Sequence, residues 1–384
     1  MKISKVANSI QPSLTRQLFD KAKHYKNVID FTLGDPDYQT PENIKNAACG
    51  AIISGNTHYS LNAGLIELRQ AIADSIFEET GVVYNPNDEI IVTVGAMQGL
   101  YLSLLSILDE DDEVIIPSPY WINYFHMTQM CKAKPILVNT YEEDGFVVKV
   151  DTLKNAISDR TAAIIINSPN NPTGGVYDSF TLKEICNLCN KNNIYLIFDE
   201  CYKSIIYDGK FVSALDCGIN KENLILINSC SKKWSMTGWR LGYVASSNKL
   251  IGNMIKLQEN MVACASLPSQ YAALEAFKNS SNEVIEMCEE FRKRRNCLIE
   301  HINKVDKLSC NIPQGTFYAM VNITKTGLSS EEFAYKLLES VQVAVVPGIT
   351  YGKCCDGYVR IAYTLNENKI IEGVKRIKKF VDSI

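Results

Sequence analysis

The side chains best suited to chemistry gather in residues 229–242, which read Ser-Cys-Ser-Lys-Lys-Trp-Ser-Met-Thr-Gly-Trp-Arg-Leu-Gly. Lys232 stands there between hydroxyl side chains, and Arg240 follows eight residues later. A partly desolvated lysine loses its proton readily, so Lys232 could bond covalently to an aldehyde and later carry a proton. Ser229 and Arg240 could hold a phosphate dianion through a hydroxyl group and a bidentate guanidinium. Taken alone, the stretch could be a solvated turn, so its meaning depends on the rest of the chain.

Polar and aromatic side chains follow three short apolar runs that are typical of buried strands. They are Trp121 after residues 114–116, Asn171 after residues 162–166, and Asp199 and Tyr202 after residues 194–198. Open α/β sheets bind ligands at the carboxyl ends of their strands, where these side chains would lie. An indole could stack on a planar ring there, and a buried carboxylate could keep a ring nitrogen protonated. A core tryptophan and an aspartate that caps a helix are the structural alternatives.

A phosphate site is also predicted at the start of a helix. Residues 89–94 are typical of a buried strand, and residues 95–108 of a helix that begins Gly-Ala-Met-Gln-Gly. The free backbone amides and positive dipole of such an N-terminus favour an anion, and they place Ala96 and Met97 beside it. The sequence contains no GxGxxG or Walker A motif, which makes a nucleotide the weaker interpretation.

Together these motifs resemble the class I and II aminotransferases, which depend on pyridoxal phosphate (PLP) and have PLP fold type I, and in particular their aspartate and aromatic members. Residues 229–242 are similar to the family signature Ser-x-Ser-Lys-x-(aromatic)-x-Met-x-Gly-Trp-Arg-x-Gly. Residues 171–174 match Asn-Pro-Thr-Gly, residues 34–37 match Gly-(Asp/Glu)-Pro-Asp, and residues 59–69 match Tyr-x-x-x-x-Gly-x-x-x-Leu-Arg. The motifs occur in the family's order along most of the chain.

The resemblance implies a role for each candidate residue. It makes Lys232, Asp199 and Tyr202 catalytic, with PLP bonded to Lys232. It implies that PLP is bound by Tyr59, Ala96, Met97, Trp121, Asn171, Asp199, Tyr202, Ser229, Lys232 and Arg240, and the substrate by Gly34, Trp121, Asn171 and Arg360. Arg360 lies in an otherwise apolar run and would hold the substrate's α-carboxylate, the alternative being an ion pair with Asp or Glu. Tyr59 would reach the phosphate of the neighbouring subunit, which implies a homodimer with shared active sites.

The activity implied is transfer of the α-amino group of an L-amino acid to a 2-oxo acid by ping-pong kinetics. Three alternatives remain open: an aspartate aminotransferase, a PLP-dependent β-lyase, and a regulatory protein that binds PLP without turnover. The Met-x-Gly-Trp-Arg-x-Gly form is more usual in aminotransferases than in lyases. No DNA-binding segment is appended that would favour a regulator.

The sequence also bears on which amino acid is used. Family members that favour dicarboxylates place a cation near the distal carboxylate, as a lysine at the position of Met97 or as an arginine in the loop after the PLP lysine. Residues 263–269 contain no basic residue, and Met97 is apolar. A thioether suits a neutral side chain, aromatic or of middle size. A preference for aspartate would require a cation from elsewhere, such as the N-terminal arm around Arg16.

The elements that must position these residues alternate along the chain. At least five apolar strands alternate with helices between about residue 45 and residue 275, which predicts an α/β fold with a mostly parallel sheet covered by helices on both faces. A charged helix and further strands after about residue 280 predict a smaller α+β domain. The N-terminal segment is expected to form a helix that ends near Asp30 and a strand at residues 31–33. The predicted division is an arm and part of the small domain (1–44), the PLP-binding large domain (45–279) and the small domain (280–384).

Composition narrows the class of partner. A chain of 384 residues with 46% hydrophobic residues can bury two cores, and a net charge of −4 argues against a nucleic-acid partner. No run approaches about 20 apolar residues, so no membrane span is expected. Thirteen scattered cysteines favour a reducing cytoplasm. Cys186 and Cys189 have a metal-like spacing but no second pair, so buried thiols are expected there and no metal site.

Overall fold

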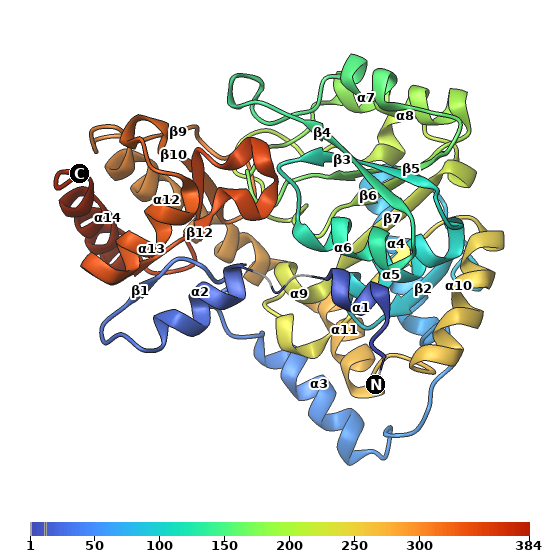
Figure 1. Ribbon diagram of the computed structural model, residues 1–384. Coiled ribbons are helices and arrows are strands. Elements are labelled where there is room, and N and C mark those ends of the chain that lie inside the picture. Colours follow the sequence, from blue (N-terminus) through green and yellow to red (C-terminus); the bar gives the residue numbers. More distant parts are fainter. Residues whose placement is uncertain (1, 11, 13) are drawn as a thin grey trace.

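The computed structural model describes residues 2–10, 12 and 14–384, and its largest sheet has seven strands in the order β2-β8-β7-β6-β5-β3-β4 (Figure 1). These strands are β2 (Ile90–Thr93), β3 (Glu113–Ser118), β4 (Lys134–Asn139), β5 (Thr161–Asn167), β6 (Tyr195–Asp199), β7 (Leu224–Ser229) and β8 (Gly242–Ala245). Strands β4, β3, β5, β6 and β7 are parallel, whereas β8 is antiparallel to both β2 and β7. The predicted mostly parallel sheet is therefore confirmed.

Helices cover both faces of this sheet. They are α3 (Glu42–Ile53), α4 (Ile66–Thr80), α5 (Gly95–Ile107), α6 (Ile122–Met130), α7 (Val150–Ala156), α8 (Ser179–Asn192), α9 (Cys230–Lys233), α10 (Asn248–Met261) and α11 (Leu267–Asn279). Alternate residues of the inner strands belong to separate cores: Ile164 and Ile166 pack on one face, and Ala163 and Ile165 on the other. Burial on both faces explains why these strands read as continuous apolar runs.

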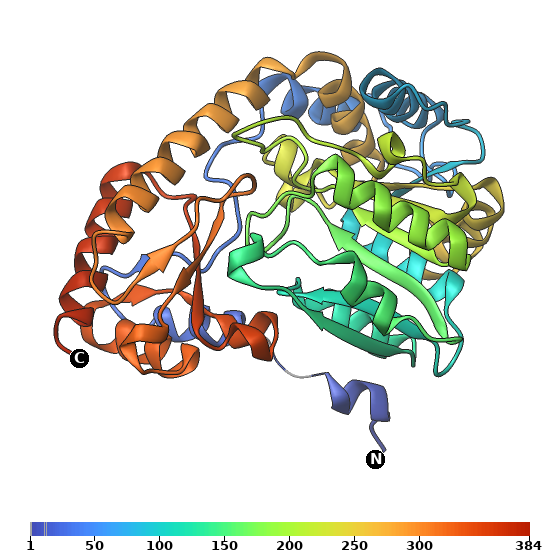
Figure 2. The same ribbon diagram turned by 90° about the horizontal axis from the view of Figure 1, so that it is seen from above.

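A second unit contains a four-stranded antiparallel sheet, β12-β13-β10-β9, and a parallel pair, β1-β11. The strands are β1 (Ile29–Asp30), β9 (Ser309–Cys310), β10 (Tyr318–Asn322), β11 (Val343–Ala344), β12 (Val346–Pro347) and β13 (Tyr358–Ala362). Its helices are α2 (Leu14–Ala22), α12 (Asn282–Ile302), α13 (Ser330–Val341) and α14 (Glu367–Val381). Figure 2 shows this unit beside the seven-stranded one, with the long helix α12 running along the outer edge from one unit to the other. The domain boundaries at residues 44 and 279 stay a prediction.

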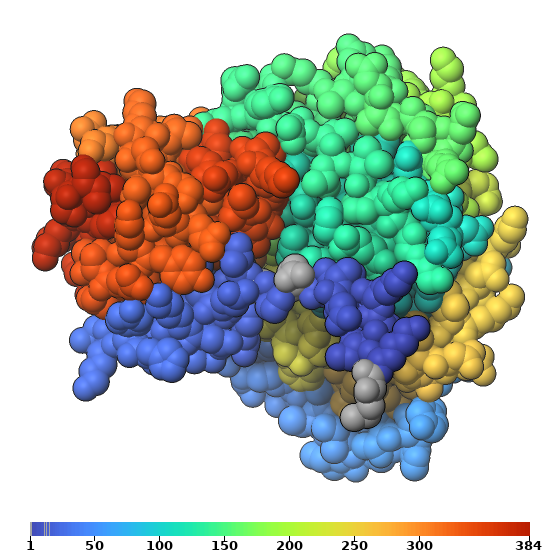
Figure 3. All heavy atoms as spheres, viewed as in Figure 1, coloured from blue at the N-terminus to red at the C-terminus, as the bar shows by residue number. Residues whose placement is uncertain are grey.

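Short elements complete the chain. The helix α1 (Lys5–Ser9) precedes α2, and in Figure 3 these blue N-terminal helices lie across the front of the molecule. The 3-10 helices are η1 (Glu142–Asp144), η2 (Ala214–Cys217), η3 (Lys221–Asn223), η4 (Thr237–Trp239), η5 (Thr324–Thr326), η6 (Gly348–Tyr351) and η7 (Lys353–Cys355). Within the described ranges, none of the helices has the length and apolar character needed to cross a bilayer.

The prediction for the N-terminal segment was wrong in its details. The helix ends at Ala22 rather than near Asp30, and the strand is Ile29–Asp30 rather than residues 31–33. Asn27 adopts a φ of 60°, a left-handed conformation that cannot continue a helix. The strand then pairs with Val343–Ala344, a partner more than 300 residues away that the local sequence does not reveal.

The expected buried thiols are confirmed. Cys186 and Cys189 both lie on the buried face of α8, and burial raises the pKa of Cys189 to about 12. Over residues 2–10, 12 and 14–384, no group of three or more His, Cys, Asp and Glu side chains is arranged to hold a metal ion.

Candidate active site

Eleven of the twelve predicted site residues line one cavity of about 340 Å³, at the carboxyl ends of β5, β6 and β7 and against the second unit. They are Gly34, Ala96, Met97, Trp121, Asn171, Asp199, Tyr202, Ser229, Lys232, Arg240 and Arg360. The twelfth, Tyr59, is 86% exposed and does not line the cavity. A larger cleft of about 860 Å³ opens beside residues 173–176, but no predicted site residue lines it.

Asp199 ends β6 at the floor of the cavity. Its Oδ2 accepts a 2.6 Å hydrogen bond from the Tyr124 hydroxyl, and its Oδ1 accepts one of 3.0 Å from the Cys201 backbone amide. Burial raises the pKa of the Asp199 carboxyl, and these two hydrogen bonds oppose the rise. Burial and the nearby Asp199 also raise the pKa of Tyr124, which therefore stays a hydrogen-bond donor. Within the described ranges no basic side chain pairs with Asp199, so a cationic group of a ligand would satisfy it.

Sequence reasoning missed Tyr124. It lies on α6 one turn after Trp121, and the two rings meet edge to face with their centroids 5.5 Å apart. The spacing of three residues on one helix was a signal that could have been read, because residues three and four apart share a face. Its partner Asp199 lies 75 residues further along the chain, so the hydrogen bond itself could not be foreseen.

Lys232 lies in α9, which begins directly after β7. Its Nζ donates a 2.6 Å hydrogen bond to the backbone carbonyl oxygen of Gly34, and it lies 5.5 Å from the ring centroid of Phe317 and 5.9 Å from that of Tyr202. The side chain is half-buried and makes no ion pair with a carboxylate in the described part of the chain. A lysine held by one carbonyl and two aromatic rings keeps its amine available for a carbonyl ligand.

One end of the cavity has the features of a phosphate site. Ala96 and Met97 occupy the first turn of α5, and Arg240 lies opposite with a φ of 53°. A Cβ on Gly95, where φ is 73°, would come within 2.8 Å of Arg240 Nη2, so only glycine lets the guanidinium approach the helix N-terminus this closely. Free amides, a guanidinium and the nearby Ser229 hydroxyl together favour a dianion.

Arg360 occupies the opposite end, on β13, and is 5% exposed. Its Nη2 donates to the Thr32 carbonyl oxygen at 2.6 Å and its Nη1 to Asn171 Oδ1 at 3.2 Å. Its buried Nε has no hydrogen-bond partner. Among the described residues no Asp or Glu forms an ion pair with Arg360, so the alternative of a structural ion pair is not supported. A buried guanidinium with an unused donor fits the carboxylate of a ligand.

The donor set therefore fits PLP with an amino acid. It combines a phosphate site, a lysine amine, a buried carboxylate without a cation and a buried guanidinium without a carboxylate. The cations that line the cavity are Lys232, Arg240 and Arg360. Met97 is 39% exposed, and no residue of 263–269 lines the cavity.

Comparisons with known proteins agree with the fold and the site. The family described as "Aminotransferase class I and II" matches residues 26–377. The "Probable aspartate/prephenate aminotransferase" of Aquifex aeolicus is 39% identical over 98% of this chain and 97% of its own. "Aromatic-amino-acid aminotransferase 2" of Thermococcus litoralis is 37% identical over 99% of this chain and 98% of its own. The structure of aspartate aminotransferase from Thermus thermophilus with maleate has a TM-score of 0.95 and 33% identity, and covers 99% of this chain and 100% of its own.

The chain belongs to the class I and II aminotransferases, with an α/β fold of PLP fold type I. It is an enzyme, a PLP-dependent aminotransferase whose substrates are amino acids and 2-oxo acids. The resemblance inferred from the motifs is thereby confirmed.

Proposed function

We propose that the cavity holds PLP with its phosphate between the α5 N-terminus and Arg240 and with Lys232 as its covalent partner. Ala96, Met97 and Ser229 would contribute to the phosphate site, Trp121 would stack on the ring, and Asn171 and Tyr202 would bond the ring oxygen. When bound, PLP supplies an aldehyde and an electron-withdrawing ring that stabilises negative charge on the amino acid's Cα. The observation that carries this proposal is Asp199, a buried carboxylate that lacks a cation in the described part of the chain.

Each catalytic side chain has one task in this proposal. Asp199 holds a proton on the ring nitrogen through its negative charge, and Tyr124 keeps that carboxylate oriented by its 2.6 Å hydrogen bond. The Lys232 amine would act first as a general base, which takes the proton from the substrate Cα, and then as a general acid, which gives that proton up. The Gly34 carbonyl, which accepts a hydrogen bond from Lys232, keeps the amine on one side of the cavity.

Arg360 would bind the α-carboxylate that all amino acids share, with Gly34 and Asn171 beside it. The substrate side chain would then lie near Met97, the partly exposed thioether in the cavity wall. We infer a preference for a neutral side chain, aromatic or of middle size, because the three cations that line the cavity have other tasks. Aspartate is the second candidate, since relatives such as the "Aspartate aminotransferase" of Pyrococcus horikoshii are 38% identical.

Single-turnover spectroscopy with a panel of L-amino acids tests the substrate, by following the change in cofactor absorbance. We expect a larger kcat/KM for a neutral amino acid than for aspartate. Met97→Lys should raise the aspartate value by roughly 10-fold or more, since a charge-assisted hydrogen bond contributes about 1.5 to 3 kcal/mol. Met97→Leu serves as the matched control without charge. A strong preference for aspartate in the unmodified enzyme would overturn this part of the proposal.

The exposed Tyr59 supports the proposal of a homodimer in which it serves the partner's phosphate site. Tyr59→Phe in one chain should then complement Lys232→Ala in the other, because a mixed dimer regains one intact site. Mixed dimers no more active than the separate variants would argue against shared sites.

The cytoplasmic location remains a proposal based on cysteine usage, and cell fractionation would test it.

A further inference from the structure

Tyr318 connects Tyr202 with Arg360, although no motif singled it out. It comes from β10 of the second unit and is 2% exposed. Its hydroxyl lies 3.1 Å from the hydroxyl of Tyr202, and the Arg360 Cζ lies 4.3 Å from the centroid of its ring. One side chain therefore touches both the proposed partner of the ring oxygen and the proposed carboxylate site.

The hydrogen bond between the two hydroxyls has a preferred direction if Tyr202 must also donate to a ligand oxygen. A phenol has one hydrogen to donate and lone pairs to accept with. If Tyr202 donated to Tyr318, it would have no hydrogen left for a ligand oxygen. If Tyr318 donates to Tyr202, the Tyr202 hydrogen is free to point into the cavity. Burial raises the pKa of Tyr202, which therefore stays a phenol with one hydrogen to donate.

The ring of Tyr318 orients the guanidinium of Arg360. Stacking on an aromatic face holds a guanidinium in one plane, here with its Nη atoms turned to Thr32 and Asn171. The same side chain explains Gly34, because a Cβ at that position would lie 1.8 Å from the Tyr318 hydroxyl oxygen. Glycine thus lets residue 34 pass over Tyr318 while its carbonyl oxygen accepts the hydrogen bond from Lys232.

We propose that Tyr318 is a positioning residue for transamination, whose hydroxyl directs the Tyr202 hydrogen toward the cofactor and whose ring orients Arg360 toward the substrate carboxylate. The inference rests on the proposed roles of Tyr202 and Arg360 and adds a physical connection between them. The two contributions are separable, because phenylalanine keeps the ring and loses only the hydroxyl.

The test compares Tyr318→Phe with Tyr318→Leu in the PLP-loaded enzyme. Tyr318→Phe should lower kcat about threefold to tenfold, the effect of one hydrogen bond, with KM within about twofold. It should leave unchanged the dissociation constant of 3-phenylpropionate, a carboxylate that cannot react, measured by calorimetry. Tyr318→Leu should in addition raise that dissociation constant by about threefold to 30-fold, because Arg360 loses the nearer of its two aromatic rings and keeps only Tyr351, whose centroid lies 5.2 Å from the Arg360 Cζ.

Tyr141→Phe, which removes a hydroxyl from a tyrosine that is 52% exposed, is the matched control. The inference is overturned if Tyr318→Phe matches this control in kcat, or if it weakens 3-phenylpropionate binding as much as Tyr318→Leu does. Tyr318→Phe decides the hydroxyl role even if Tyr318→Leu fails to fold. A wild-type chain that does not bind PLP would instead refute the proposed function, which keeps the two failures distinct.

Discussion

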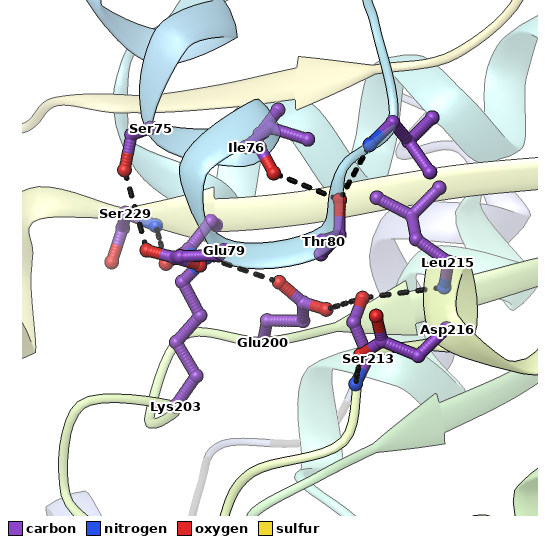
Figure 4. Close-up of polar contacts among 12 residues, drawn as sticks. Ser75, Ile76, Glu79, Thr80, Glu200, Lys203, Ser213, Leu215, Asp216 and Ser229 are labelled. Atoms are coloured by element: carbon purple, nitrogen blue, oxygen red, sulfur yellow. Dashed lines mark hydrogen bonds and ion pairs between the residues drawn. The ribbon is translucent and has the colours of Figure 1, made fainter.

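Asp199 and Glu200 are adjacent buried carboxylates that the fold treats in opposite ways. Burial raises the pKa of both. Glu200 lies outside the cavity, where its Oε1 accepts a 2.5 Å hydrogen bond from the Ser213 hydroxyl and its Oε2 lies 3.4 Å from Lys203 Nζ (Figure 4). Lys203 also pairs with Glu79 at 2.5 Å. Asp199 faces the cavity, where its partners are a phenol and a backbone amide.

The difference separates a structural charge from a functional one. Glu200 has a cationic partner inside the protein, Lys203, so its network has no need of a ligand. The charge of Asp199 is hydrogen-bonded but not neutralised, which costs stability unless a cationic ligand group binds. Arg360 is the complementary case, a buried cation without a carboxylate in the described part of the chain. Unbalanced buried charges of opposite sign that line one cavity indicate a ligand there.

The largest expected effect separates Lys232 from its neighbour Lys233. Lys232→Ala should lower turnover by about 10⁴-fold or more, because the proton carrier is lost, while PLP still binds weakly through its phosphate. Lys233 packs over the Trp234 ring, 4.6 Å from its centroid, on the side of the Glu200 network. Lys233→Ala should therefore leave the rate within about threefold. Near-normal transamination by Lys232→Ala, measured in single turnovers, would refute the assignment.

The next effect tests the unbalanced carboxylate directly. Asp199→Asn keeps the shape of the side chain but loses the charge, so the chemical step should slow by about 10²- to 10³-fold. The dissociation constant of PLP should change far less, because the phosphate contacts remain. Glu200→Gln is the matched control one residue away and should leave the single-turnover rate within about threefold. Equal effects of the two substitutions on that rate would remove the distinction between them.

Arg360→Lys should produce a smaller loss. The lysine keeps the positive charge but not the planar fork, so kcat/KM should fall by roughly 10- to 150-fold for every amino acid tested. Arg376→Lys on α14, where Arg376 pairs with Glu372 at 2.9 Å, controls for the substitution itself. A loss confined to one amino acid would show that Arg360 does not bind the common carboxylate.

The smallest effects are on stability, and they differ between the two carboxylates. The pKa of Asp199 in the folded state is raised above 3.8, so the PLP-free folded chain binds this proton more tightly than the unfolded chain. Its stability should fall as the pH rises from about 4 through the raised pKa, and Asp199→Asn should remove that fall. The pKa of Glu200 is raised as well, so its ionisation also costs stability as the pH rises. Glu200→Gln removes that cost but takes from the buried Lys203 one of its two carboxylates, so it should leave the free energy of unfolding at pH 7 within about 1 kcal/mol of the wild-type value or lower it.

Chemical denaturation of the PLP-free proteins at several pH values measures both changes. If Asp199→Asn destabilises the PLP-free protein at pH 7, the Asp199 charge is already balanced without a ligand. If Glu200→Gln stabilises it by more than about 1 kcal/mol, the Glu200 network does not balance its own charge. Either result would contradict the contrast between the two carboxylates.

The sequence by itself determined the α/β sheet and most of the site. Asn171, Asp199 and Lys232 each follow an apolar strand, and parallel strands bring their carboxyl ends to one edge of the sheet. The burial of the inner strands could be predicted, because a strand buried on both faces forms a continuous apolar run. The order of these strands in the sheet could not be predicted from the sequence. The edge strand β4 was missed, since five of its six residues are exposed or half-buried and its apolar residues do not alternate regularly with polar ones. β8 was missed because its first residue, Gly242, is also the last residue of the lysine motif.

Only the tertiary structure decided which charges have partners. Tyr124 and Tyr318 entered the site through contacts with Asp199 and Tyr202, 75 and 116 residues away along the chain. Whether Arg360 meets an acidic side chain depended on which distant residues pack against it, whereas Lys203, the partner of Glu200, lies only three residues along the chain. A hydrogen bond or ion pair requires two groups within about 3 to 4 Å, and the chain brings distant residues that close only when the whole core packs.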